Sequence, residues 1–144
     1  QADGWYLRTD IIWNKPNCQP ESVKDRPTRA HEYVFLFSKS EKYYYDWQAI
    51  MEPAADVKKK SKNRRTVWNI NTEPYPGSHF AVYPKALVRV CVAAGSSENG
   101  RVLDPFFGSG TTGVVCNELG RNCVGIELNA EYAELARKRL LRGR

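Results

Sequence analysis

The chain has 144 residues, a formal net charge of +6 and an isoelectric point near 9.2. This length suits one domain with a reasonable core, and the basic balance suits a polyanionic partner. No apolar run approaches the roughly 18 residues of a membrane span and no signal peptide opens the chain, so we expect a soluble, intracellular protein without membrane contact. The four cysteines have no metal-ligand spacing, so no metal site is predicted, and Cys91, Cys116 and Cys123 are expected to be reduced core thiols.

The first part of the chain predicts strands. Residues 4–13 are rich in β-branched and aromatic side chains, and a proline-containing loop follows them. Residues 31–38 form a nearly continuous apolar run, which predicts a strand buried on both faces. A short helix is expected around residues 46–51, and residues 66–71 alternate like another strand.

Residues 55–65 form a basic segment, in which six of eleven residues are Lys or Arg. Most charge runs of this kind are solvated loops, and that interpretation stays open. The alternative is contact with nucleic-acid phosphates, which is independent of sequence and sensitive to salt.

Two helices are predicted in the second part of the chain. The first has Pro84 at its first position and Gly95 just past its end, with Leu87, Val88, Cys91 and Val92 on one packed face. The second covers residues 130–141, with Asn129 as N-cap, Gly143 past the end and Arg137, Lys138 and Arg139 facing outward.

Residues 101–129 contain a strand, a glycine turn, a helix and a second strand. The first strand ends in Asp104, glycines follow at 108, 110 and 113, a helix is expected over 111–119, and the second strand ends in Glu127. The spacing fits GxGxxG with an acid 19 residues after the first glycine. Such glycines permit a tight turn and close approach of a ligand, and the acid can accept hydrogen bonds from both ribose hydroxyls.

The charge of this turn favours one class of nucleotide. A carboxylate about 6 Å from a phosphate would cost roughly 3 kcal/mol at an effective dielectric near 20, so Asp104 disfavours a dinucleotide. The same acid attracts an ammonium or a sulfonium, and S-adenosylmethionine carries both without a phosphate. Only 15 residues follow Asn129, too few for the second half of a dinucleotide domain. A glycine turn that binds no cofactor is the remaining alternative.

Residues 104–112 (DPFFGSGTT) and 125–129 (GIELN) resemble the cofactor motifs of S-adenosylmethionine-dependent DNA amino-methyltransferases, which methylate adenine or cytosine. Residues 4–17 and 29–40 are similar to two strands of that family, in the beta-type motif order. The resemblance implies a cytoplasmic protein of a prokaryotic or phage restriction-modification system that acts on double-stranded DNA.

The resemblance also implies the site residues. The expected cofactor-binding residues are Asp104, Pro105, Phe106, Gly108, Ser109, Gly110, Thr111, Thr112, Glu127 and Asn129, with His79, Phe80 and Ala81 at the methionine end. A loop histidine without a ligand is an equal alternative for His79. The expected DNA-binding residues of the basic segment are Lys58, Lys59, Lys60, Lys62, Arg64 and Arg65, because the segment stands where the family has its target-recognition region. Lys15 is added because the family's loop after the first strand approaches the target base.

The implied fold class is α/β, a Rossmann-like methyltransferase sheet with helices on both faces. Residues 1–144 would form a single partial domain. Within it, residues 1–40 would be an antiparallel edge-strand pair, residues 41–77 a short target-recognition region and residues 78–144 the cofactor-binding half.

The catalytic motif of the family is missing. The Asp/Ser/Asn-Pro-Pro-aromatic tetrapeptide that holds the target amine does not occur, and Asp104-Pro105-Phe106-Phe107, the nearest string, lies in the cofactor turn. In this motif order the tetrapeptide would precede residue 1, so we assign no catalytic residue and expect a fragment or one part of a split enzyme, inactive alone. Missing central strands would leave unpaired apolar edges, which a second chain or self-association would cover. A non-catalytic DNA- or cofactor-binding module is the alternative function.

Overall fold

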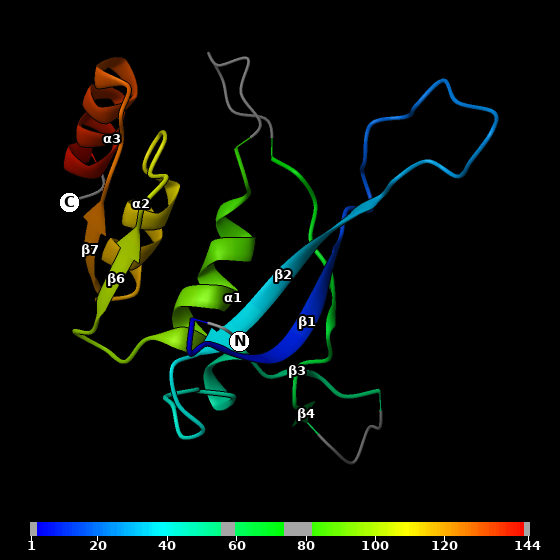
Figure 1. The fold of residues 1–144 in the computed structure, drawn as a ribbon, viewed down its shortest axis with the longest axis horizontal. Coiled ribbons are helices and arrows are strands. Elements are labelled where there is room, and N and C mark those ends of the chain that lie inside the picture. The colour runs from blue at the N-terminus through cyan, green and yellow to red at the C-terminus, as the bar shows by residue number, and fades with distance from the viewer. Residues whose placement is uncertain (1–2, 56–59, 74–81, 143–144) are drawn as a thin grey trace. The chain divides into compact units, whose positions relative to one another are not determined.

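The structure, a computed structural model, describes residues 3–55, 60–73 and 82–142 (Figure 1). The chain forms two compact units. The first, which we call the sheet unit, comprises residues 1–43 and 64–73, and the second, the βαβ unit, comprises residues 44–63 and 74–144. None of the helices in the described part of the chain is long and apolar enough to cross a membrane.

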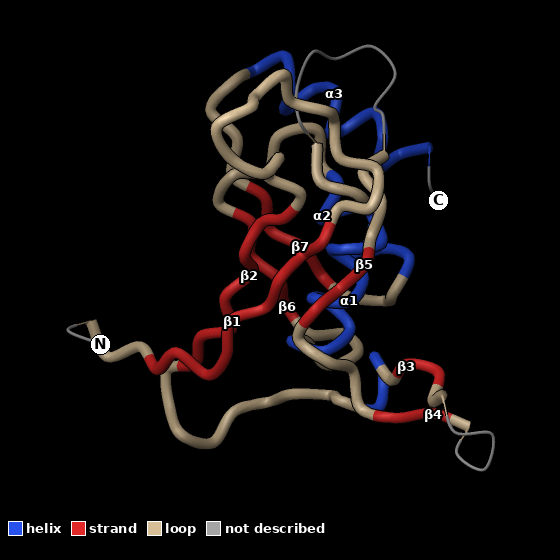
Figure 2. The backbone as a smooth tube through the Cα atoms, turned by 90° about the vertical axis from the view of Figure 1, so that its right-hand side faces the viewer, coloured by secondary structure: helices blue, strands red, loops and turns tan. Residues whose placement is uncertain are grey.

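The sheet unit is a three-stranded sheet with the order β2-β1-β5 (Figure 2). β1 (Tyr6–Asn14) and β2 (His31–Ser38) are antiparallel, with Tyr6 opposite Ser38 and Asn14 opposite His31, and the register shifts once between Leu7 and Thr9. β5 (Val67–Asn69) lies parallel to β1. The predicted antiparallel strand pair is therefore confirmed. The strand expected at residues 66–71 is observed as β5, the third strand of this sheet.

The prediction that the second strand is buried on both faces is wrong. Tyr33, Phe35 and Phe37 alternate along β2 and are 48–53% exposed. The rings of Tyr33 and Phe35 are stacked with centroids 6.0 Å apart, and the rings of Phe35 and Phe37 are tilted by 49° with centroids 6.2 Å apart. The side chains between them are more buried. Because successive strand residues point to opposite faces, a continuous apolar run can hide one exposed row of rings.

The βαβ unit contains a parallel strand pair joined by a helix, which confirms an α/β fold (Figure 1). β6 (Arg101–Asp104) and β7 (Asn122–Gly125) run parallel, with Arg101 opposite Asn122 and Asp104 opposite Gly125. The remaining elements are η1 (Gln48–Ile50), the antiparallel pair β3 (Glu52–Pro53) and β4 (Ser61–Lys62), α1 (Lys85–Gly95), α2 (Thr111–Glu118) and α3 (Ala130–Arg142).

The core of the βαβ unit lies between α1 and α2. Val88 and Val92 of α1 pack with Val115 and Cys116 of α2, and Val102, Leu119 and Cys123 complete this cluster. A second cluster joins Ile50 of η1 to Ala93 and Ala94. At the surface, Glu118 of α2 pairs with both Lys85 (3.0 Å) and Arg89 of α1. These contacts fix the two helices against the strand pair.

Three predictions for α1 are wrong. Pro84 is the N-cap rather than the first helical residue, because its backbone is extended and the helix begins at Lys85. Cys91 is exposed and belongs to neither core cluster, because α2 and η1 pack against other positions of the helix. Gly95 is the last helical residue rather than the one past the end. The backbone N–H and hydroxyl of Ser96 both donate to the Val92 carbonyl, at 3.1 and 2.6 Å, and these bonds close the helix without a left-handed glycine.

Candidate functional site

Two acids lie where the parallel strands β6 and β7 end. Asp104 is the last residue of β6, and Glu127 stands two residues beyond the end of β7. The loops that leave the strands are tied together, because Ile126 N–H donates to the Asp104 carbonyl and Phe107 N–H to the Ile126 carbonyl, each at 2.9 Å. Carboxyl ends of parallel strands form one edge of a sheet, which is where α/β folds bind ligands.

The Glu127 carboxylate is held by two backbone amides. Gly108 N–H donates to Oε2 at 2.7 Å, and Asn129 N–H donates to Oε1 at 2.8 Å. A carboxylate has about four acceptor positions, so roughly two remain for a ligand. Glu127 is therefore oriented by the protein and can still accept hydrogen bonds from a diol.

The Asp104 carboxylate has three donors. Phe106 N–H bonds to Oδ1 at 3.0 Å, whereas the hydroxyls of Thr112 and Tyr83 bond to Oδ2 at 2.6 and 3.0 Å. The two hydroxyl oxygens are 3.0 Å apart. Burial, and then the negative charge of Asp104, raise the pKa of Tyr83 from 10.0 to about 12, so the phenol stays protonated and donates.

The glycines of the turn have different neighbours. A Cβ on Gly110, which has φ +80°, would lie 2.9 Å from the Ala136 Cβ, and a Cβ on Gly113 would lie 2.7 Å from the Phe107 ring. Gly108 has φ +52°, and its nearest neighbour would be 4.0 Å away. Gly110 and Gly113 are thus needed for close packing within the protein, and Gly108 is the glycine of this turn with open space beside it.

Two large apolar side chains close to the acids in sequence are almost completely exposed. Phe106, two residues after Asp104, is 86% exposed, and Leu128, the residue after Glu127, is 99% exposed. Single exposed apolar side chains are ordinary. Because both side chains are close to the acids in the sequence and exposed, both are accessible to a flat apolar ligand.

Other predicted cofactor residues are engaged within the protein. Arg139 of α3 donates to the carbonyl and hydroxyl oxygens of Ser109, each at 2.8 Å, and to the Thr111 hydroxyl at 3.4 Å. The expectation that Arg139 faces outward is therefore wrong, although Arg137 and Lys138 are exposed. Asn129 Oδ1 accepts from the amides of the next turn, Glu131 at 2.8 Å and Tyr132 at 3.3 Å, which confirms the N-cap.

The structure brings together most of the predicted cofactor residues, within residues 104–112 and 127–129. Pro105 is exposed in the same turn, whereas His79, Phe80 and Ala81 lie outside the described residues. Sequence reasoning did not single out Tyr83, Phe107, Leu128 or Arg139. The sequence signal for Phe107 and Leu128 was their position within the two cofactor motifs, whereas the contacts of Tyr83 and Arg139 join segments far apart in the chain.

The predicted DNA-binding residues divide between the two units. Lys60 is exposed, and Lys62 pairs with Glu52 across β3 and β4 at 3.4 Å, both in the βαβ unit. Arg64 and Arg65 belong to the sheet unit, where the Arg64 guanidinium lies 5.9 Å from the Trp68 ring centroid. Lys58 and Lys59 lie outside the described residues.

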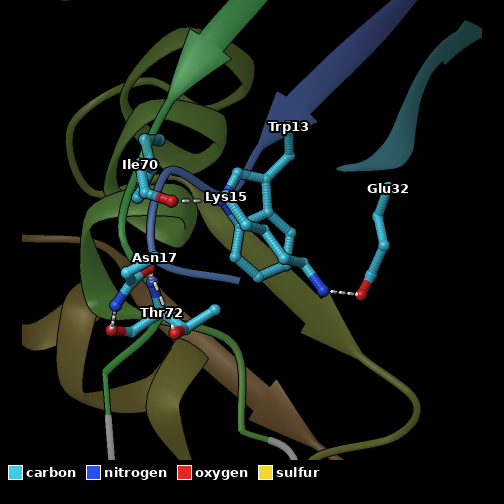
Figure 3. A network of polar contacts seen from close by, with 6 residues as sticks. All are labelled: Trp13, Lys15, Asn17, Glu32, Ile70 and Thr72. Carbon is cyan, nitrogen blue, oxygen red and sulfur yellow. Dashed lines mark hydrogen bonds and ion pairs between the residues drawn. The ribbon is translucent and has the colours of Figure 1, made fainter. Parts of the chain in front are cut away.

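Lys15 is part of a polar network at the end of β1 (Figure 3). Its ammonium pairs with Glu32 and lies 4.6 Å from the Trp13 ring centroid. The indole N–H of Trp13 donates to the Ile70 carbonyl at 2.8 Å. Nearby, the Asn17 amide bonds to both backbone groups of Thr72, at 2.8 and 3.1 Å (Figure 3). The network anchors the loop after β1 to the segment after β5.

Comparison with known proteins gives one family. A family model described as DNA methylase matches residues 1–138. Type II methyltransferase M.SmaI of Serratia marcescens is 76% identical over 144 residues, which are 100% of this chain and 49% of that protein. Type II methyltransferase M.Cfr9I of Citrobacter freundii is 59% identical, over 97% of this chain and 46% of that protein.

A solved structure, the M1.HpyAVI–SAM complex, has a TM-score of 0.76 and 29% identity, over 96% of this chain and 64% of that chain. The chain spans about half the length of the curated relatives it matches. The matched region includes both acids and the glycine turn between them. The chain therefore belongs to the DNA methylase family, the S-adenosylmethionine-dependent amino-methyltransferases of DNA, and has their Rossmann-like fold class.

Proposed function

We propose that this chain is the cofactor-binding part of a site-specific DNA methyltransferase that acts on the exocyclic amine of adenine or cytosine. The observation that carries the proposal is the Glu127 carboxylate, held by the amides of Gly108 and Asn129 at the carboxyl ends of two parallel strands. Its remaining acceptor positions suit the two ribose hydroxyls of a nucleoside.

The other residues of the turn fit S-adenosylmethionine better than a dinucleotide. Asp104 supplies a negative charge for a cation where a dinucleotide would need a phosphate site. Gly108 leaves room for a ligand, and Phe106 and Leu128 offer exposed apolar surface to an adenine ring. When bound, the cofactor supplies an electrophilic methyl group on its sulfonium. The residues of this chain bind and orient that cofactor.

The rest of the predicted cofactor site has supporting roles in this proposal. Ser109, Gly110, Thr111, Thr112 and Asn129 fix the shape of the turn through their contacts with Asp104, α2 and α3. Pro105 limits the backbone at its start. His79, Phe80 and Ala81 would line the methionine end, as the family resemblance implies.

The chain by itself is proposed to bind cofactor without methylating DNA. The sequence has no Asp/Ser/Asn-Pro-Pro-aromatic tetrapeptide, so the group that would hold the target amine is missing from it. The alternative function is a non-catalytic binding module. A radiolabel assay on double-stranded DNA tests the absence of catalysis that both functions expect of the isolated chain: methyl transfer by this chain alone would contradict the alternative and the proposed inactivity.

Calorimetry on the folded chain tests the cofactor proposal directly. We expect S-adenosylmethionine and its demethylated product S-adenosylhomocysteine to bind, and NAD to show no measurable heat. A Glu127→Ala variant should bind both adenosyl ligands more weakly. Binding of NAD in place of the adenosyl ligands would overturn the proposal.

Double-stranded DNA is the proposed partner, contacted through phosphates. Lys60 is an exposed cation in the described part of the basic segment, and Lys62, Arg64 and Arg65 continue it. Non-specific contacts of this kind lower the binding constant as salt rises, with a slope set by the number of phosphates neutralised. We propose that Lys58 and Lys59 contribute to the same contacts.

We also propose that the chain takes part in one methyltransferase domain, with an edge-strand pair at residues 1–40, a target-recognition region at 41–77 and the cofactor half at 78–144. The half-exposed rings of Tyr33, Phe35 and Phe37 would then be covered by a second chain or by self-association. Size-exclusion chromatography of the chain at several concentrations tests this, because a stable monomer at all of them contradicts it.

A further inference from the structure

Tyr83 connects the start of α1 to the acid at the end of β6. Its hydroxyl lies 3.0 Å from Asp104 Oδ2 and 3.0 Å from the Thr112 hydroxyl, so residues from three segments of the βαβ unit meet at one carboxylate oxygen. Pro84, the next residue, is completely buried, and α1 packs against α2. The phenol is therefore held in position from the side of α1 as well as by its hydrogen bonds.

The donors are distributed unequally over the two oxygens of Asp104. Oδ2 accepts both hydroxyls, and Oδ1 accepts the Phe106 amide at 3.0 Å. Since each carboxylate oxygen has about two acceptor positions, Oδ2 is saturated and Oδ1 retains roughly one. A cation that approaches Asp104 would bond to Oδ1.

We infer that Tyr83 is a positioning residue, which orients Asp104 so that Oδ1 receives the ammonium of the methionine part of the ligand. This inference rests on the proposed function and adds a residue to the site that it describes. Fixing a charged acceptor before the ligand arrives lowers the ordering cost of binding. In a Tyr83→Phe variant, Thr112 alone would hold Oδ2, and the carboxylate could rotate away from the orientation that the ligand needs.

A positioning role and a purely structural role of Tyr83 predict different effects on ligand affinity. A phenylalanine fills nearly the same space as tyrosine, so the packing at the start of α1 is preserved. 5′-Methylthioadenosine has the adenine, ribose and thioether of S-adenosylhomocysteine but no ammonium. If Tyr83 acts through Asp104 on the ammonium, removal of the Tyr83 hydroxyl should lower the affinity for S-adenosylhomocysteine and leave the affinity for 5′-methylthioadenosine unchanged.

The experiment measures both ligands by calorimetry, the weaker one by displacement, on the full 144-residue chain and on Tyr83→Phe. We expect the affinity for S-adenosylhomocysteine to fall roughly tenfold, the loss of one hydrogen bond to a charged group, and that for 5′-methylthioadenosine to change less than about twofold. Thr112→Val, which removes the other hydroxyl on Oδ2, should show the same selectivity. Tyr33→Phe, in the sheet unit, is the matched control and should change neither affinity.

Each remaining outcome is decisive. An equal loss for both ligands would assign Tyr83 a structural role, and an unchanged affinity for S-adenosylhomocysteine would remove it from the site; either result overturns the inference and leaves the proposed function standing. Failure of the unaltered chain to bind either ligand would instead overturn the proposed function, and the inference with it.

Discussion

The backbone N–H of Gly108 donates a 2.7 Å hydrogen bond to Oε2 of Glu127, 19 positions away in the chain. The first glycine of the turn and the acid after the next strand are thus bonded directly to each other. Because the acid is fixed by the turn, the motif acts as one structural unit.

Replacement of Glu127 by alanine should weaken S-adenosylhomocysteine binding by roughly 1.5–3 kcal/mol, the range for a lost hydrogen bond to a charged group. The same change should lower stability, because the amides of Gly108 and Asn129 lose their acceptor. Calorimetry and urea unfolding measure the two effects. Glu134→Ala removes an equal charge from an exposed pair with Lys138 and serves as control. Equal affinities for the two variants would exclude Glu127 from the site.

Gly125→Ala should destabilise the chain by about 1–3 kcal/mol, because the new methyl group would lie 2.3 Å from Cγ of the Phe107 ring. In a Phe107→Ala background the same substitution should cost much less, since the ring is gone. Urea unfolding of the four proteins gives the coupling between the two positions. Gly95→Ala is the control, because nothing lies within 4 Å of its added methyl group and alanine favours a helix. Additive effects at residues 107 and 125 would contradict the packing.

Stability should fall as pH rises above about 9. Burial, and then the neighbouring Cys116, raise the pKa of Cys123 from 9.0 to about 12, and burial raises that of Tyr83 from 10.0 to about 12. The unfolded chain loses these protons at lower pH than the folded chain, so this contribution is complete below pH 9 and is lost between about 9 and 12. Urea unfolding from pH 8 to 11 measures it. Cys123→Ala should flatten the dependence, and an identical pH profile would refute the assignment.

Among the predicted DNA contacts, Lys60 and Lys15 should behave differently. Lys60 is exposed, whereas the Lys15 ammonium already pairs with Glu32 and lies over the Trp13 ring. We therefore expect Lys60→Gln to reduce the salt slope of DNA binding by about one and Lys15→Gln to leave it nearly unchanged. Fluorescence anisotropy over a salt series measures both slopes. A smaller slope in Lys15→Gln alone would show that Lys15 leaves its partners to contact a phosphate.

Local patterns in the sequence predicted much of the βαβ unit. The glycine spacing, the acids after each strand and the Asn129 cap are all determined by residues close to one another in the chain, so they could be predicted without a structure. The sequence wrongly predicted that both faces of β2 are buried and that Cys91 is a core residue, whereas one row of β2 side chains and Cys91 are exposed. Both depend on which elements pack against a face, and apolar periodicity does not contain that information.

The sequence by itself determined the cofactor motif, the α/β class and the absence of a catalytic tetrapeptide. Only the tertiary structure decided which groups bond to the two acids, that Phe107 fills the space left by Gly113 and Gly125, and that Arg139 turns inward to Ser109. The physical reason is range. Turn and cap preferences act over a few residues. Apart from the Phe106 and Asn129 amides, which are two positions from their acids, these contacts join groups 6 to 30 positions apart, which the folded chain alone brings within bonding distance.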